Sequence, residues 1–354
     1  MADTDVTSSV ATESRARQGI SGFFKTLFRH HPLGAFGLLV TAAFFVLAIF
    51  AEQIAPYDMN DTDINRRLQP PSREFLLGTD LIGRDYLSRI IGGTRTSLTI
   101  GMAAAALSVL ISVALGTLSG YLGGVTDMLI QRFVDAWMAI PGLIILMVMM
   151  SIVGTSVFAM ILVLSLGGVV ASRMIRSTVI RIKEDMYLSA AKAVGSSTPR
   201  LLLRHILPNI LAPIIVLFTS SVPGYILAES TLSFLGFGIG PPTPSWGGML
   251  GGSGGFGPRT QMFEAPWLAI WPGVALGLVV YGANMFGDAL RDILDPRLRG
   301  GVGSFGRSKA LEKRLQEASP NGTSGNGTSP GVAAVNDPPR TGSTASVESS
   351  SEEE

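Results

Sequence analysis

The sequence predicts an all-α integral membrane protein with six transmembrane helices and with both termini in the cytoplasm. Of its 354 residues, 47% are hydrophobic and only 15% are charged, whereas soluble domains carry about 25% charged residues. Several uncharged apolar stretches reach the roughly 20 residues that cross about 30 Å of hydrocarbon. Lys and Arg gather in the segments that this arrangement places on the cytoplasmic side.

The apolar stretches define six spans. Four of them stand alone, but an uncharged run over residues 136–172 would extend about 55 Å as one helix, which is too long for a single crossing. The weakly apolar segment Ser151–Ser156 divides this run, so we expect two helices there. The expected spans cover residues 33–52, 97–120, 128–150, 157–172, 206–228 and 267–288.

Positive charge sets the orientation. The loop over residues 52–96 holds six arginines, but it is long and also holds seven acids, so its charge says little about the orientation. Residues 1–30 then form a cytoplasmic N-terminal segment, and residues 31–300 form the transmembrane domain. The loop between the fourth and fifth spans, which this orientation places in the cytoplasm, carries seven basic residues: Arg173, Arg176, Arg181, Lys183, Lys192, Arg200 and Arg204.

Both ends of the chain are polar. Residues 1–22 do not form a cleavable signal peptide, because the first apolar segment is long enough to span and no small-residue cleavage pattern follows it. Residues 301–354 are rich in Ser, Gly, Pro, Thr and Glu, so we expect a disordered cytoplasmic tail. Within that tail, Gly301–Ser308 has the spacing of a phosphate-binding loop but carries Arg307 where such a loop needs Lys. We therefore expect no ATP site, no cofactor and no enzyme activity in this chain.

Other kinds of site find little support. The chain has no cysteine and three histidines, so it offers neither a disulfide framework nor a metal site. No run of Lys or Arg indicates nucleic-acid binding. A secondary transporter stays open as an alternative, although the uncharged spans offer no proton relay. Asp135 follows Arg132 by three residues, which predicts a structural ion pair on one helix face.

Small residues mark two further features. Gly116, Gly120 and Gly124 repeat at four-residue spacing, which indicates either a close helix interface or merely the abundance of glycine in membrane helices. In the loop before the fifth span, the small residues from Ser189 to Ala193 predict a short helix over residues 186–195. Gly195 permits the left-handed turn that ends such a helix. This loop exceeds thirty residues, far more than a connection needs, and alanines let a helix sit deep in the groove of a partner.

This loop resembles the cytoplasmic signature of the membrane subunits of ATP-driven (ABC) importers, which reads Glu-Ala-Ala, three residues, Gly, nine residues, Ile, one residue, Leu-Pro. The resemblance implies the type I importer permease fold, in which the loop is the coupling helix that docks into an ATPase subunit. The chain departs from the signature at Ser189, where the family has Glu, and at His205, where it has Ile. It matches at Ala190, Ala191, Gly195, Leu207 and Pro208.

Other segments are similar to the C-type permeases of dipeptide and oligopeptide importers, and the resemblance extends over roughly residues 25–300. It implies a bacterial inner-membrane protein that works with a homologous permease, two ATPases that bind ATP and Mg²⁺, and an external solute-binding protein. The implied substrates are short peptides, with nickel complexes, glutathione or another small solute as alternatives. The matching segments are Leu77–Arg89, Ala228–Gly238, Pro241–Gly247 and Asn284–Pro296.

The expected outer segment after the fifth span supplies the candidate pathway residues. An acid close to the membrane is costly and marks substrate routes, which favours Glu229 as a functional group. A structural partnership of Glu229 with an arginine of the first outer loop stays open as well. The candidates for the pathway or its outer rim are Glu229, Ser230, Ser233 and Trp246.

Overall fold

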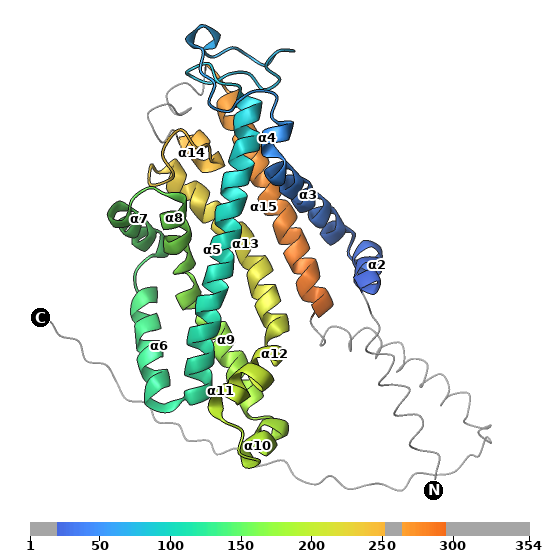
Figure 1. Cartoon of the computed structure of the whole chain (residues 1–354), viewed down its shortest axis with the longest axis vertical. Coiled ribbons are helices and arrows are strands. Elements are labelled where there is room, and N and C mark those ends of the chain that lie inside the picture. Colours follow the sequence, from blue (N-terminus) through green and yellow to red (C-terminus); the bar gives the residue numbers. More distant parts are fainter. Residues whose placement is uncertain (1–19, 252–263, 295–354) are drawn as a thin grey trace, which may run out of the picture. The chain divides into compact units, whose positions relative to one another are not determined.

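The computed structural model describes residues 20–251 and 264–294, and these residues form helices joined by loops (Figure 1). No strand occurs within these two ranges, where Thr79 and Asp85 make an isolated β-bridge. The predicted tail over residues 301–354 and the first nineteen residues lie outside the described part of the chain. An all-α membrane protein is therefore confirmed for the described residues.

The first span pairs with the last. Helix α2 (Ile20–His30) precedes α3 (Pro32–Ile49), and the short α4 (Ala51–Ile54) follows. Helix α3 lies against α15 (Trp267–Leu294). A Cβ atom on Gly37 would lie 2.5 Å from the carbonyl oxygen of Gly282, so glycine allows the two backbones to approach closely.

Helix α5 (Tyr86–Leu122) begins earlier than the predicted residue 97 and contains 37 residues. Its length of about 55 Å exceeds the hydrocarbon thickness, so part of the helix extends beyond the bilayer. Asp85 fixes the start, because its side chain accepts a hydrogen bond from the backbone N–H of Ser88 at 2.8 Å. Gly116 and Gly120 contact helix α9 (Gly168–Lys183), whereas Gly124 has no neighbour within 4 Å of an added Cβ. The four-residue glycine repeat thus marks a helix interface at two of its three positions.

The two spans predicted over residues 128–150 and 157–172 each correspond to a pair of helices with a bend between them. Helices α6 (Gly124–Met138) and α7 (Gly142–Val153) meet at 89°, with Pro141 at the break. Proline has no N–H and clashes with the preceding turn, which explains the break. Helix α8 (Val157–Ser165) and α9 are bent by 40°. The described residues hold four helices long and apolar enough to span, or six spans if each bent pair counts as one.

The fifth span starts later than predicted and runs farther. After α10 (Met186–Ala193) come α11 (Thr198–Leu201), a π-helical turn (Leu202–Ile206) and α12 (Leu207–Asn209). Helix α13 (Leu211–Phe234) then forms the fifth span, which the sequence placed at residues 206–228. The short α14 (Trp246–Gly251) follows it. Pro208 accounts for the irregular start, because it cannot donate the hydrogen bond that a regular helix needs there.

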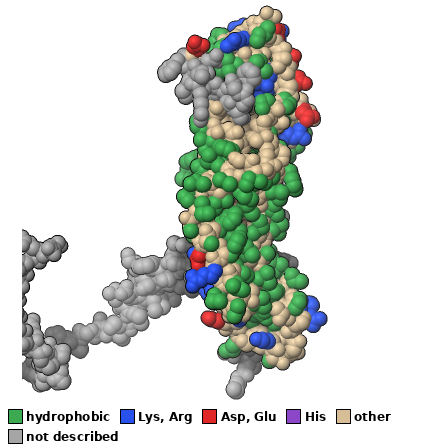
Figure 2. Space-filling view, turned by 90° about the vertical axis from the view of Figure 1, so that its left-hand side faces the viewer, with side chains coloured by type: hydrophobic (Ala, Val, Ile, Leu, Met, Phe, Trp, Pro, Cys, Tyr) green, Lys and Arg blue, Asp and Glu red, His purple; other side chains and the backbone are tan. Residues whose placement is uncertain are grey.

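Figure 1 shows α10 near one end of the long helix α5 and α14 near the other. We call these the α10 end and the α14 end. On the face seen in Figure 2, hydrophobic side chains cover the middle, and charged side chains gather toward the two ends. A bilayer explains this apolar band, since water-soluble proteins rarely expose contiguous apolar surface of this extent. Exposed apolar side chains on the helices include Leu33, Phe36, Leu39, Leu110 and Leu118.

Candidate coupling surface and sites at the two ends

Helix α10 coincides with the predicted coupling helix and projects an apolar face into solvent. Met186 and Val194 are each 88% exposed, and Ala190 lies between them at helical spacing, also exposed. Ser189 is exposed, whereas Ala191 is half-buried. On the opposite face Leu188 is buried and packs with Ile175, Val179, Ile206 and Ile210. One side of α10 therefore anchors the helix to the spans, and the other side is free within the described part of the chain.

Gly195 ends α10 in the left-handed turn that the sequence predicts. Its φ is +86°, a conformation that glycine adopts without steric cost. The N–H of Gly195 donates to the carbonyl of Lys192 at 3.0 Å, and the N–H of Ser196 donates to that of Ala191 at 3.2 Å. These two hydrogen bonds form a Schellman motif, which fixes the direction in which the chain leaves α10.

His205, Leu207 and Pro208 lie in and just after the π-helical turn, between α10 and α13. The ring of His205 lies 6.4 Å from that of Tyr187. Asn209 donates through Nδ2 to Tyr187 Oη at 2.8 Å and to the carbonyl of His205 at 2.6 Å. Burial, together with the charge of Asp185, raises the pKa of Tyr187, so its hydroxyl stays protonated at neutral pH.

Glu229 lies fully buried near the C-terminal end of α13. Ser233 donates to its Oε1 at 2.7 Å, while Ser97 and Ser230 donate to its Oε2 at 3.1 and 3.3 Å. Because Ser97 belongs to α5, the carboxylate links two spans. No described arginine makes an ion pair with it, so serine hydroxyls take the place of the arginine partner that the sequence left open.

Trp246 is a buried anchor of the α14 end. It is 0% exposed, its ring meets Phe44 edge-on at 5.8 Å, and its Nε1 donates to the carbonyl of Ile90 at 3.2 Å. Its backbone N–H donates to Ser97 Oγ at 3.3 Å. A Cβ on the next residue, Gly247, would lie 2.3 Å from the backbone of Ser230. The segment around α14 is thus packed directly on α13 beside Glu229.

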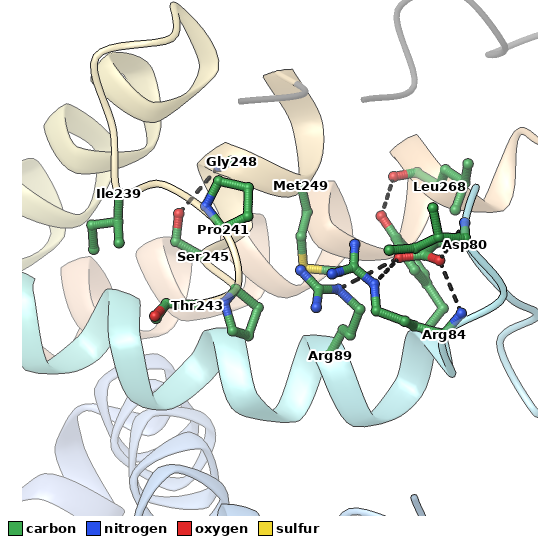
Figure 3. A pocket seen from close by; sticks show the side chains of 13 residues that line it. Asp80, Arg84, Arg89, Ile239, Pro241, Thr243, Ser245, Gly248, Met249 and Leu268 are labelled. Atoms are coloured by element: carbon green, nitrogen blue, oxygen red, sulfur yellow. Dashed lines mark hydrogen bonds and ion pairs between the residues drawn. The ribbon is translucent and has the colours of Figure 1, made fainter. Parts of the chain in front are cut away.

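A cluster of charges next to α14 was not identified from the sequence, where Leu77–Arg89 served only for its resemblance. Asp80 Oδ2 pairs with Arg84 Nε at 2.6 Å and with Arg89 Nε at 3.7 Å, as the dashed lines in Figure 3 mark. Its Oδ1 accepts from the backbone N–H groups of Ile82 and Arg84. Asp80 begins a turn, where Asp is favoured because its side chain accepts from nearby backbone N–H groups, and this was the signal that could have indicated the cluster.

A second charge cluster holds α6 to α9. Arg176 donates to Asp127 twice, from Nε to Oδ1 at 2.6 Å and from Nη2 to Oδ2 at 2.5 Å. Asp135 pairs with Arg132 at 3.9 Å, which confirms the predicted ion pair, and it also contacts Arg173. Among the described residues, no three His, Asp or Glu side chains are grouped so that they could hold a metal ion.

Two family models match the chain. Residues 112–300 match the binding-protein-dependent transport system inner membrane component, and residues 26–71 match the N-terminal transmembrane domain of oligopeptide transport permease C.

Curated relatives cover most of the chain. The dipeptide transport system permease protein DppC of Alkalihalophilus pseudofirmus is 39% identical over 277 residues, or 78% of this chain and 89% of the relative. The oligopeptide transport system permease protein OppC of Bacillus subtilis is 37% identical and covers 77% of this chain and 88% of the relative. The glutathione transport system permease protein GsiD of Pectobacterium atrosepticum is 35% identical and covers 78% of this chain and 91% of the relative.

These matches include the loop that holds α10 and the segments around Glu229 and Asp80. Family membership also agrees with the helical architecture and with the exposed apolar band. The chain therefore belongs to the binding-protein-dependent transport system inner membrane components, as a C-type permease subunit of an ABC importer in the bacterial inner membrane.

Proposed function

We propose that this chain, paired with a homologous permease, forms the translocation pathway for short peptides that an external solute-binding protein delivers. Two separate ATPase subunits bind ATP and Mg²⁺ and supply the energy. The observation that carries the proposal is the apolar face of α10, 88% exposed at Met186 and Val194, on a helix whose other face is anchored by Leu188. An apolar patch beyond the membrane-embedded band is typical of a protein interface.

The geometry supports α10 as the coupling element. Alanine at positions 190 and 191 lets the backbone approach a partner closely, as the ATPase groove requires. The Schellman motif at Gly195 and the buried Leu188 fix α10 relative to the spans. A displacement of the ATPase surface therefore moves α10 as a unit.

The route from α10 into the membrane runs through the π-helical turn. Tyr187 contacts Asn209 and His205, and Leu188 belongs to the same buried hydrophobic cluster as Ile206 of that turn. A π-helical turn marks a functional irregularity in a helix, and here it stands directly before α13. Helix α13 ends at the Glu229 cluster, so movement at α10 reaches the α14 end through one helix.

Charge supports a cytoplasmic location for the α10 end. Basic side chains near it include Arg181, Lys183, Lys192, Arg200 and Arg204, and cytoplasmic loops carry such an excess. With α10 inside, the α14 end and the loop before α5 face outward, where a binding protein can reach them. Both termini are then cytoplasmic.

Glutathione is the second candidate substrate, because a relative named as a glutathione permease is 35% identical. The test is uptake of labelled dipeptides and of labelled glutathione by cells that express this chain with its partner subunits. We expect dipeptide uptake that depends on ATP and on the binding protein. Uptake without either would contradict the proposal, and uptake of glutathione alone would select the second candidate.

A further inference from the structure

A small cavity lies at the α14 end. Its volume is about 100 Å³, and it is lined from three directions, one of which is α15 through Leu268 (Figure 3). The loop before α5 and the first turns of α5 contribute Asp80, Arg84 and Arg89. The segment that leads into α14 contributes Thr243 and Ser245. We refer to it as the arginine cavity.

The lining of the arginine cavity holds two cations and one anion. The side chains of Arg84, Arg89 and Asp80 are 11%, 8% and 8% exposed. Each guanidinium has five N–H donors. The described residues give Arg84 one acceptor, Asp80, and give Arg89 two, Asp80 and the carbonyl of Met59 at 3.0 Å. Donors therefore remain that no described residue satisfies.

The nearby carboxylate of Asp85 makes no ion pair with either guanidinium of the cavity, and both pair with Asp80 instead. Asp85 does not line the cavity, and its Oδ2 is engaged as the cap of α5 by the N–H and hydroxyl of Ser88, at 2.8 and 2.6 Å. The hydroxyl of Tyr86, the other polar group on this helix turn, donates to the carbonyl of Leu268 at 2.6 Å. Guanidinium donors that line a cavity and have no protein acceptor favour an incoming carboxylate.

The size of the arginine cavity limits what can fill it. A water molecule occupies about 30 Å³ of liquid, and sites for whole small molecules measure roughly 300–1,000 Å³. A cavity of about 100 Å³ has room for the carboxylate end of one Asp or Glu side chain, and it lies below the usual range for sites that enclose a whole small molecule.

We propose that the arginine cavity receives a carboxylate side chain of the external solute-binding protein when that protein docks. This inference rests on the proposed function and adds a site to it. The cavity lies at the end opposite α10, in the segments that the proposed orientation turns outward. An occupant would bridge Arg89 of α5 and the segment that packs on α13 at Ser230, so docking engages the same helix that α10 moves.

Four variants of the complete transporter test the inference, with binding-protein affinity measured in lipid nanodiscs. Arg89→Gln removes a donor group of the cavity. Thr243→Glu, at an exposed lining residue, supplies a carboxylate that competes with the incoming one, and Thr243→Gln has the same shape without the charge. Arg95→Gln is the control, because Arg95 is 56% exposed and pairs with the exposed Glu52 away from the cavity.

We expect Arg89→Gln to weaken docking about ten-fold or more, as charged hydrogen bonds do. Thr243→Glu should weaken docking at least ten-fold more than Thr243→Gln, and Arg95→Gln should stay within about two-fold of wild type. Wild-type affinity for Thr243→Glu would overturn the inference even if Arg89→Gln fails to fold. Retention of the ATPase subunits reports the folding of each variant.

The carboxylate could come from the binding protein or from the peptide substrate. To distinguish these sources, each measurement is repeated with empty binding protein, with a dipeptide and with the C-terminally amidated dipeptide. Equal losses in all three states support a side chain of the binding protein. A loss confined to the free dipeptide would assign the cavity to the substrate carboxylate and overturn the inference. If no binding protein associates with the wild-type complex, the proposed function and the inference fail together.

Discussion

Tyr187 on α10 and Asn209 at the end of α12, just before α13, are joined by a hydrogen bond of 2.8 Å between Asn209 Nδ2 and Tyr187 Oη. The two residues belong to the proposed coupling helix and to the start of the fifth span, and the π-helical turn lies between them in the sequence. The contact is therefore a direct link across the region where movement of the ATPase must enter the membrane.

Removing this link should uncouple transport from hydrolysis. Tyr187→Phe keeps the ring beside His205 but removes the hydroxyl, and one such hydrogen bond contributes about 0.5–1.5 kcal/mol. We expect peptide uptake per ATP hydrolysed to fall roughly two- to ten-fold, while the ATPase stays bound. Unchanged coupling in Tyr187→Phe would show that motion passes through the Leu188 contacts alone.

Gly195 should tolerate asparagine better than valine. Its φ of +86° costs other residues about 1–2 kcal/mol, least for Asn and most for β-branched side chains. No atom lies within 4 Å of an added Cβ, so backbone conformation alone decides the effect. The amount of ATPase that co-purifies should decline from the wild type to Gly195→Asn and decline further in Gly195→Val. A valine variant that binds as well as wild type would mean that the turn can be replaced.

Glu229 should act as a structural hub rather than as a substrate contact. Glu229→Leu leaves the hydroxyls of Ser97 and Ser233 without their acceptor, which costs about 1–3 kcal/mol for each buried group. Glu229→Gln keeps an acceptor and should cost less. Thermal unfolding of the purified complex measures the difference. A Glu229→Gln variant with wild-type stability but a raised KM for peptide would instead support the pathway role.

Two single-cysteine variants test the topology, and the absence of natural cysteine from the chain makes the labelling specific. A cysteine at Asp61, which is exposed in the loop before α5, should react with an impermeant thiol reagent added to intact cells. A cysteine at Ser196 should react only after the cells are opened. The reverse pattern would invert the proposed orientation.

The sequence indicated the spans well where an apolar run is bounded by charge, as in α3 and α15. It missed the start of α5, because the Asp85 cap lies in a polar segment that extends the helix beyond the bilayer. It also missed the 89° bend before Gly142, because hydropathy does not report direction. Pro141 was visible, but proline alone does not determine an angle.

The candidate site was predictable to different degrees. The place of α10 and its end at Gly195 followed from small residues and spacing. The serine partners of Glu229 did not, because Ser97 comes from a helix 132 positions away in the sequence. The arginine cavity joins the loop before α5 to the segment before α14, and only tertiary packing brings these together.

The most direct test of the account is co-purification of the ATPase subunits with the Ala191→Glu permease. A bulky, charged side chain at this half-buried alanine overpacks a close contact, which costs about 1–3 kcal/mol, and places a charge in the interface. Ser189→Glu is the matched control, because it adds the same side chain two positions away, where the resembled signature carries Glu. The account predicts loss of ATPase and of uptake for Ala191→Glu, normal membrane insertion, and retained association for Ser189→Glu. Undiminished association and uptake in Ala191→Glu would contradict the assignment of α10 as the coupling helix.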